Sequence, residues 1–367
     1  MQAAMIPFAI IVLLACRGDH GTSPTPEGQV RAVAPMAVSR AAHTATLLRN
    51  GKVLVAGGFG GGQSALASVE LFSPEEGRFA AAGAMRVARS SHTATLLPDG
   101  RVLIAGGFDG GYLSSAELYD PVTGSFTATG AMTVARSDHI AVLLPNGKVL
   151  VAGGVGTGWT FLSSAELYDP ATGRFAPTGS LSVPRESHTA TLLRDGRVLI
   201  TGGHQGRHAA ITIYASAEVY DPANGRFTRV GDMRVRRHKH DAVALADGSV
   251  LVLGGSDERD ERGQYRSAEL FDPRSGSFSE TGSMQAPRYK FNGASVLLAD
   301  GSVLLMGGSA VTELYDPVRR TFATLSPGVG VARLFAAATR LPDGGVLLTG
   351  GYGTGVASSA GAWVFRP

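Results

Sequence analysis

Cysteine is nearly absent from this sequence. The 367 residues contain a single cysteine, Cys16, so no disulfide can form within the chain. Charge is sparse as well, because charged residues make up 17% of the chain and the formal net charge is only +3. The apolar run at residues 6–14 is too short to span a bilayer, since a membrane helix needs about 20 residues. A stable fold must therefore come from a hydrophobic core of ordinary size rather than from disulfides or lipid.

Several motifs with known chemistry are missing. The sequence contains no G-x-S-x-G, no H-E-x-x-H, no phosphate-binding loop and no EF-hand spacing, which removes the commonest signatures of hydrolases, zinc peptidases, nucleotide-binding proteins and calcium loops. No segment with helical periodicity follows the first apolar run. We therefore expect an all-β fold with no cofactor and no metal site.

The N-terminal segment resembles an export signal. Residues 6–14 are apolar apart from Pro7, a length typical of a signal-peptide core. The run ends in Leu-Leu-Ala-Cys at residues 13–16, which resembles a bacterial lipobox; the resemblance implies cleavage before Cys16 and acylation of its thiol. A cleaved signal with an incidental cysteine is the alternative. Residues 17–27 are polar, with Gly, Ser and Pro, and are predicted to be a flexible tether. We expect an exported protein of the bacterial cell envelope, held to a membrane only through a lipid, or otherwise a secreted one.

The rest of the sequence is built from one repeated unit, written most clearly at residues 85–131. Four short apolar runs lie in it, separated by turn residues. Asp99-Gly100 joins the first two runs and is predicted to be a two-residue hairpin connection. Each unit should form a four-stranded antiparallel sheet, which is marginal alone and must stack on its neighbours.

Seven copies are present, at a spacing of roughly fifty residues. Each copy has an Asp-Gly or Asn-Gly hairpin followed by a Gly-Gly pair; the pairs begin at Gly57, Gly106, Gly153, Gly202, Gly254, Gly307 and Gly350. The sequence starts and ends midway through a unit, so a strand from 28–35 can complete the unit begun at 329–367. The predicted units are 36–84, 85–131, 132–180, 181–232, 233–283, 284–328, and 329–367 plus 28–35, in one domain covering 28–367.

These motifs resemble kelch repeats. The features that carry the resemblance are Arg-x-x-His before the first strand, Gly-Gly after the second, Glu-Leu-Tyr-Asp in the third and Gly-x-Phe in the fourth. The resemblance implies a seven-bladed β-propeller of the galactose oxidase/kelch type, most simply a monomer. The copper chemistry of galactose oxidase requires a Tyr–Cys cross-link, and the only cysteine here is Cys16. We therefore exclude that chemistry.

The arginines and histidines of the repeat are predicted to be structural. Identical residues placed on separate blades diverge rather than converge on one ligand. We expect each arginine to bridge to a glutamate on the third strand of its own unit. The arginines are Arg40, Arg89, Arg136, Arg185, Arg237 and Arg333; the histidines are His43, His92, His139, His188 and His240; the glutamates are Glu70, Glu117, Glu166, Glu218, Glu269 and Glu313.

A binding site is expected where the units differ, namely in the loops after Gly-Gly and before the first strand. In kelch propellers these loops share one face, and here they carry aromatic and cationic side chains suited to sugars, carboxylated glycans or acidic peptides. The candidate ligand-binding residues are Tyr112, Trp159, Arg207, Arg237, Tyr265 and Arg288. The sixth unit departs furthest: Gly293 is predicted at its histidine position, and its short loop at Ser309-Ala310 should leave a notch in the rim.

Three functions remain open. The first is a non-catalytic propeller that binds a glycan or protein on its loop face. The second is a carbohydrate-active enzyme similar to the mutarotase-like sialic acid epimerases, and the third is a purely structural spacer. An enzyme should gather unrepeated acid–base residues at the axial opening, whereas the deviations in sequence are scattered, which favours binding over catalysis. An export signal argues against nucleic acid as the partner.

Overall fold

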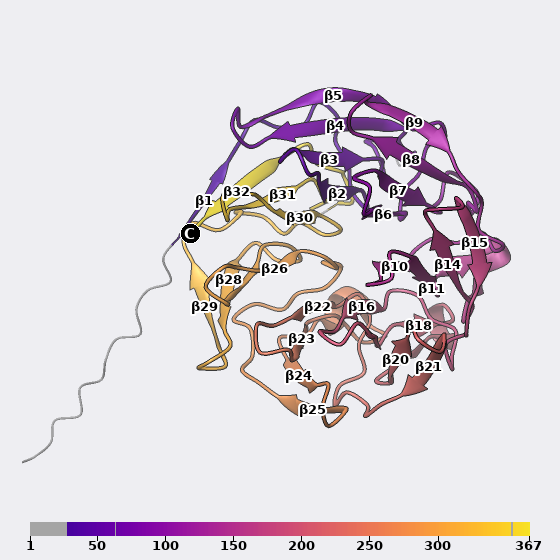
Figure 1. Ribbon diagram of the computed structural model, residues 1–367. Helices are drawn as coiled ribbons and strands as arrows, with labels where there is room; N and C mark the ends of the chain where they lie inside the picture. The colour runs from indigo at the N-terminus through magenta and orange to yellow at the C-terminus, as the bar shows by residue number, and fades with distance from the viewer. Residues whose placement is uncertain (1–27, 63, 354) are drawn as a thin grey trace, which may run out of the picture.

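The computed structural model describes residues 28–62, 64–353 and 355–367. The predicted signal at 1–16, with Cys16, and the tether at 17–27 lie outside the described residues. The chain forms seven four-stranded antiparallel sheets arranged as blades around a central axis (Figure 1). The predicted seven-bladed propeller is therefore confirmed.

Each blade is described here from its innermost to its outermost strand. Blade one consists of β2 (Thr44–Leu47), β3 (Val53–Ala56), β4 (Ser68–Ser73) and β5 (Arg78–Ala84), and blade two of β6 (Thr93–Leu96), β7 (Val102–Ala105), β8 (Ala116–Asp120) and β9 (Ser125–Ala128). Blade three consists of β10 (Ile140–Leu143), β11 (Val149–Ala152), β14 (Ala165–Asp169) and β15 (Arg174–Pro177), and blade four of β16 (Thr189–Leu192), β17 (Val198–Thr201), β20 (Ala217–Asp221) and β21 (Arg226–Arg229). Blade five consists of β22 (Asp241–Ala244), β23 (Val250–Leu253), β24 (Ala268–Asp272) and β25 (Ser277–Glu280), and blade six of β26 (Ser295–Leu297), β27 (Val303–Leu305), β28 (Thr312–Asp316) and β29 (Thr321–Leu325). Blade seven consists of β30 (Ala337–Arg340), β31 (Val346–Thr349), β32 (Ala362–Arg366) and β1 (Gln29–Ala32).

Short elements decorate the loops after the second strands. Two small hairpins are formed by β12 (Val155–Gly156) with β13 (Thr160–Phe161) and by β18 (His204–Gln205) with β19 (Thr212–Ile213). Three single-turn 3₁₀ helices accompany them: η1 (Thr157–Trp159), η2 (His208–Ala210) and η3 (Asp260–Gly263). In the part of the chain that the structure describes, no helix has the length and hydropathy required to cross a membrane.

The ring closes through its two ends. Strand β1 pairs antiparallel with β32, with Gln29 opposite Arg366 and Ala32 opposite Trp363. The N-terminal segment thus supplies the outermost strand of blade seven, as the sequence predicts. Closure removes the exposed sheet edge that an open array would leave.

The inner hairpins differ from the prediction in one detail. In blade two, the amide of Leu97 donates to the carbonyl of Arg101 over 2.8 Å, and the amide of Gly100 donates to the carbonyl of Leu97 over 3.0 Å. The loop therefore has three residues, not two, with Gly100 at φ 91°. A type I turn followed by a left-handed glycine is the usual form of a three-residue hairpin loop, which explains why glycine is the last residue of this loop in every repeat.

The core lies between blades rather than within them. Seven clusters of buried apolar side chains are found, one at each contact of adjacent blades. The second strands are buried on both faces, and β7 and β11 are buried at every residue. This agrees with their continuously apolar sequences. The first strands of adjacent blades contact one another and surround the central channel.

Blade six carries an insertion that the sequence analysis did not recognise. A Cβ on Gly202 would meet the ring of His240, and a Cβ on Gly254 would meet the ring of Phe291 in the same way, at 2.7 and 2.8 Å. Phe291 therefore occupies the histidine position, and the placement of Gly293 there is wrong. Asn292 and Gly293 form an additional turn before β26, closed by the amide of Ala294 donating to the Phe291 carbonyl.

Candidate functional site

Six blades bury an arginine at the start of the Arg-x-x-His motif. In blade three the guanidinium of Arg136 is completely buried. It donates to Glu166 over 3.0 Å and to the carbonyls of Gly153 and Ser164, both over 2.9 Å. The predicted bridge to the third-strand glutamate is confirmed for five arginines and is wrong for Arg333, since Arg288 holds Glu313 instead. The pairs, at 2.8–3.0 Å, are Arg40–Glu70, Arg89–Glu117, Arg136–Glu166, Arg185–Glu218, Arg237–Glu269 and Arg288–Glu313.

This layer corrects two of the six candidate ligand contacts and holds a third, Tyr265, at its edge. Arg237 and Arg288 are fully buried members of it, so neither can reach a ligand on the rim. The ring of Tyr265 lies against the Arg237 guanidinium, 5.8 Å from its centroid, and is itself half-buried. Arg333 in blade seven has no glutamate opposite it and lies over the ring of Trp363 at 4.8 Å instead.

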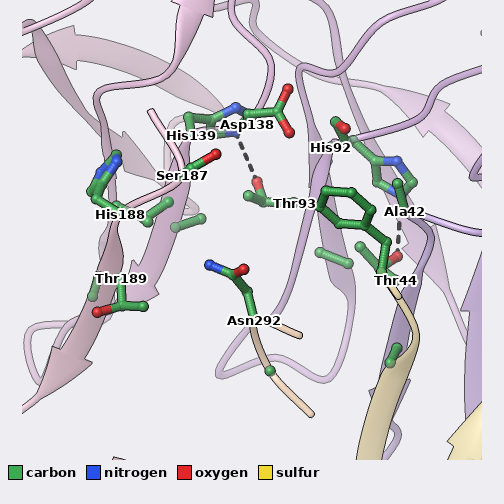
Figure 2. Close-up of a pocket in the computed structure, with 18 of the residues that line it drawn as sticks. Ala42, Thr44, His92, Thr93, Asp138, His139, Ser187, His188, Thr189 and Asn292 are labelled. Atoms are coloured by element: carbon green, nitrogen blue, oxygen red, sulfur yellow. Dashed lines mark hydrogen bonds between the residues drawn. The ribbon is translucent and has the colours of Figure 1, made fainter. Parts of the chain in front are cut away.

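The histidines join neighbouring blades. The Nε2 atom of His139 lies 3.1 Å from the Thr93 hydroxyl of the preceding blade, and that of His92 lies 3.1 Å from Thr44 (Figure 2). Burial lowers the pKa of all five, to about 3 for His43 and His188. These imidazoles are neutral at physiological pH. His43, His92, His139 and His240 link their blade to the preceding one by hydrogen bonds, whereas neither ring nitrogen of His188 has a partner among the described residues.

The residue before each motif histidine, or before its counterpart in blades six and seven, forms a ring around the channel opening. The seven members all adopt left-handed backbone conformations, with φ between 49° and 54°. Six of the seven neighbouring pairs are joined by an amide-to-carbonyl hydrogen bond of 2.6–3.1 Å across blades. We call this set the mouth ring: Ala42, Ser91, Asp138, Ser187, Lys239, Lys290 and Phe335.

The two residues between arginine and histidine are the least repeated of the motif. The first of them makes an isolated backbone bridge to the residue after Gly-Gly in six blades. Since the backbone supplies these bonds, the side chains can differ freely. The first-position residues are Ala41, Ser90, Ser137, Glu186, His238, Tyr289 and Leu334. Blades three to six thus bring unrepeated titratable groups to one opening.

A chain of hydrogen bonds connects blades four and five. Glu186 Oε1 lies 3.1 Å from His204 Nε2, and His204 Nδ1 lies 3.1 Å from His238 Nδ1. His238 Nε2 lies 3.1 Å from the Ser256 hydroxyl. Both histidines are buried. Burial lowers the pKa of His238 to about 3, so its ring is neutral; a neutral His238 that accepts from the Ser256 hydroxyl through Nε2 donates to His204 through Nδ1.

The chain continues into an ionic cluster. The Ser256 hydroxyl lies 3.4 Å from Asp260 Oδ1, which accepts from the Lys239 ammonium over 2.8 Å. The Lys290 ammonium lies 3.6 Å from the other oxygen of Asp260. Burial lowers the pKa of Lys239, while the adjacent Asp260 favours its charged form. Within the described residues, no group of three or more His, Cys, Asp or Glu side chains has the arrangement of a metal site.

A cavity of 430 Å³ extends from the mouth ring along the first strands. Asp138, Ser187 and the amide of Asn292 line it, and Asn292 projects toward its middle (Figure 2). Burial and then the charge of Glu186 raise the pKa of Asp138 to about 6, although Ser137 donates to its carboxylate over 3.0 Å. The cavity therefore holds a carboxyl group that can change its protonation near neutral pH.

Asn292 is held in the channel by a neighbouring blade. The carboxylate of Asp241 accepts hydrogen bonds from the amides of Gly293, Ala294 and Ser295, at 2.9, 3.1 and 2.9 Å. Burial nevertheless raises the pKa of Asp241 to about 6. Asp241 thus fixes the inserted turn that presents the Asn292 amide.

The other three candidate residues come together beside this opening. Trp159, which is 49% exposed, lies under the Arg207 guanidinium at 3.4 Å and meets the Tyr112 ring edge-on at 5.9 Å. Burial raises the pKa of Tyr112, and the charges of Glu186 and Asp138 raise it further. The Tyr112 hydroxyl is buried and has no hydrogen-bond partner among the described residues.

Sequence reasoning selected the face on which these groups lie but missed several of them. Asp138, Glu186, His238 and Lys239 were not selected, because Arg-x-x-His was interpreted only through its repeated residues. The available signal was the opposite one, namely unrepeated residues within a strongly repeated motif. His204, Asp260 and Lys290 lie in the segments that the prediction assigned to this face, but their connection across blades was not visible in sequence.

Comparison with known proteins supports the repeat and the fold. The Kelch motif matches residues 89–133, 139–182 and 187–234, whereas no curated protein matches the chain. Among solved structures, the chain is similar to a fungal alcohol oxidase of the AA5 family in complex with copper. The two are 17% identical over 93% of this chain and 76% of that chain, with a TM-score of 0.70. At this identity the likeness shows the fold alone. The chain therefore contains repeats that match the Kelch motif, within a seven-bladed β-propeller.

Proposed function

We propose that this propeller is a non-catalytic binding protein that takes a glycan at the channel mouth. One observation carries the proposal: Tyr112, Trp159 and Arg207, from three different blades, meet beside the unrepeated polar groups of the mouth ring. The three residues come from consecutive blades, so the packing of blades two, three and four brings them together.

The chemistry of this cluster suits a sugar. An exposed indole held by its neighbours offers an apolar face to the C–H groups of a pyranose. Glu186 and Asp138 can accept hydrogen bonds from hydroxyls, and the unpartnered Tyr112 hydroxyl can donate or accept one. Arg207 is exposed and can move to stack on or bond to the ligand.

The test is a thermal-shift screen of the protein against neutral sugars, sialylated and uronic-acid glycans and peptidoglycan fragments. A ligand at a hundred times its dissociation constant should stabilise the fold by about 2.7 kcal/mol. We expect a hit that Trp159→Ala abolishes and Val318→Ala preserves. Val318 is an exposed apolar residue of the β28–β29 turn, at the end of its blade away from the mouth. A panel without hits, or a hit that is insensitive to Trp159→Ala, would contradict the proposal and favour a protein ligand or a structural spacer.

We further propose export and lipid anchoring through Cys16. The lipobox-like Leu-Leu-Ala-Cys at 13–16 and the use of the sole cysteine there support this. A labelled fatty acid should be incorporated into the wild type and not into Cys16→Ser. Equal labelling of both, or of neither, would rule the anchor out.

A carbohydrate-active enzyme is the second candidate. The observation that favours it is the gathering of unrepeated acid–base groups at the axial opening, including Asp138 with its pKa raised to about 6. A catalytic base needs such a value near the working pH. If the bound glycan is converted, Asp138→Asn should abolish product formation while binding persists; if it is recovered unchanged by the wild type, the enzyme candidate fails.

A further inference from the structure

The contact between blades five and six departs from the repeat in a coordinated way. Asp241 stands where blades one, two and four carry a threonine, Phe291 stands where the first five blades carry a histidine, and two further residues follow Phe291. The buried Asp241 carboxylate accepts from three amides of this inserted turn. The turn in turn extends the Asn292 side chain into the channel cavity (Figure 2). Burial of a carboxylate is unfavourable, and such exceptions to a local rule are expected at functional sites.

The wall of this cavity carries negative charge. Two carboxylates, Asp138 and Asp241, line it, whereas no lysine or arginine does. Four histidines also line it, but burial is the main cause that lowers the pKa of each, so they are neutral at physiological pH. A cation in the cavity is therefore attracted by two carboxylates and meets no like charge on the wall.

Asp138 is the carboxylate that a ligand can reach. The oxygens of Asp241 are buried and bound to the inserted turn, whereas Asp138 is only half-buried. Lys239 does not line the cavity, and its ammonium is bound to Asp260 over 2.8 Å. After burial, the charge of Glu186 is the largest cause that raises the pKa of Asp138, and it outweighs the opposite effect of Lys239. The surroundings of Asp138 therefore favour an added positive charge.

The acceptors beside Asp138 suit an ammonium group. A primary ammonium has three N–H donors and no acceptor, and a carboxylate can accept at about four positions. Asp138 can therefore bond to a ligand as well as to Ser137, which donates to it over 3.0 Å. The Ser187 hydroxyl and the Asn292 amide oxygen can accept the remaining hydrogens, and Figure 2 shows both side chains extending into the cavity. A metal ion fits less well, because the described residues contain no group of three His, Cys, Asp or Glu arranged to hold one.

We propose that the channel cavity binds the primary ammonium group of a small organic ligand. The ammonium donates to Asp138, Ser187 and Asn292, and the carbon atoms of the ligand pack on Ile140 and Phe335, which also line the cavity. The volume of 430 Å³ lies within the range of small-molecule pockets, about 300–1,000 Å³. No residue of the Trp159 cluster lines the cavity, so this site does not depend on the glycan proposed there.

The test is a titration of the protein with cadaverine at neutral pH, followed by NMR of the ligand. Two analogues of the same chain length are the controls. Pentanediol has no charge, and pentamethonium keeps both charges but has no N–H donor. Cadaverine should bind to the wild type, and each analogue should bind about tenfold more weakly or less.

Two variants and a control locate the site. Asp138→Asn removes the charge with little change of shape, and asparagine tolerates the left-handed backbone at this position; it should weaken cadaverine binding about tenfold. Asn292→Ala removes the amide while the backbone of the turn keeps its bonds to Asp241, and it should weaken binding about fivefold. Asp109→Asn changes an exposed carboxylate that does not line the cavity, so binding should stay unchanged.

Trp159→Ala separates this proposal from the previous one, because cadaverine binding should survive it. The proposal is overturned if cadaverine does not bind, if either analogue binds as tightly, or if Asp138→Asn binds like the wild type. Loss of cadaverine binding in Trp159→Ala would overturn it too, since the amine would then lie on the aromatic cluster and not in the channel.

Discussion

Two sets of residues in the same short motif have different roles in this propeller. The arginine and histidine of Arg-x-x-His point into the protein, where the arginine meets glutamate and backbone carbonyls and the histidine meets the preceding blade. The two residues between them point to the channel mouth and differ from blade to blade. One motif thus supplies both the scaffold and the site.

The reason lies in which groups make the bonds. The scaffold positions bond through their side chains, so a change of residue breaks the blade. The mouth positions bond through their backbone, in the bridges and in the mouth ring, so any side chain that tolerates the conformation is accepted. Variation can therefore accumulate at the mouth without loss of the fold.

Acidification should give the largest effect, because it acts on the whole scaffold layer. Six buried histidines have pKa values held below 6.5, chiefly by burial: His43, His92, His139, His188, His238 and His240. The unfolded chain binds their protons below pH 6.5, whereas the folded chain binds them only well below that value, at about pH 3 for His43, His188 and His238. Stability therefore falls as the pH drops below 6.5. At pH 5 each histidine should lower the free energy of unfolding by about 2 kcal/mol relative to pH 8.

Asp138 and Asp241 act in the opposite direction. Their pKa values are raised from 3.8 to about 6, so the folded chain binds these protons at a higher pH than the unfolded chain does. At pH 5 each carboxyl therefore adds about 1 kcal/mol to the free energy of unfolding. Urea unfolding from pH 8 to 4 should still show a net loss. His139→Phe, which copies the natural Phe291 of blade six, should reduce the number of protons taken up on unfolding by up to one, and so make the fall of stability with pH less steep. A flat profile would contradict the buried, neutral layer.

Removal of one scaffold arginine should be the most damaging single change. Arg136→Ala leaves Glu166 buried and unpaired, which should cost about 3–5 kcal/mol. Arg333→Ala is the matched control in blade seven, where Trp363 replaces the glutamate; loss of this cation–π contact should cost about 1 kcal/mol. Urea titration of both variants measures the difference. Equal losses would show that the buried ion pair does not distinguish the blades.

Asp241→Ala should have an intermediate effect. It removes the acceptor of three amides in the inserted turn, at a cost of about 2–3 kcal/mol. Asp241→Asn keeps one carbonyl oxygen and should lose about half as much. Unfolding midpoints give the comparison; an unchanged midpoint in Asp241→Ala would mean that the turn does not depend on this carboxylate.

A change in the mouth ring should have the smallest effect. Ser91 has φ 49°, so Ser91→Gly relieves left-handed strain of about 1 kcal/mol while adding a similar entropy to the unfolded chain. Stability should stay within about 0.5 kcal/mol of the wild type in the same urea assay. A loss comparable to that of Arg136→Ala would mean that the mouth positions are as constrained as the scaffold.

The sequence was sufficient for the fold because the fold is repetitive. Seven Asp/Asn-Gly and Gly-Gly signals place the blades, and the unmatched ends predict closure by β1. Arg288 was misassigned because the Asn292-Gly293 insertion shifts blade six out of register, which hid its place in the arginine layer. The path from Glu186 to Asp260 could not be predicted, since it connects loops whose conformations no repeat determines.

Tryptophan fluorescence tests the central claim most directly. The chain has only two tryptophans, Trp159 at the mouth and Trp363 in blade seven, so Trp363→Phe leaves Trp159 as the sole reporter. Titration of this variant with the glycan panel should change the intensity or wavelength of its emission, with saturation at the affinity found by thermal shift. An emission spectrum that stays constant while a glycan binds would place the site elsewhere and contradict the account.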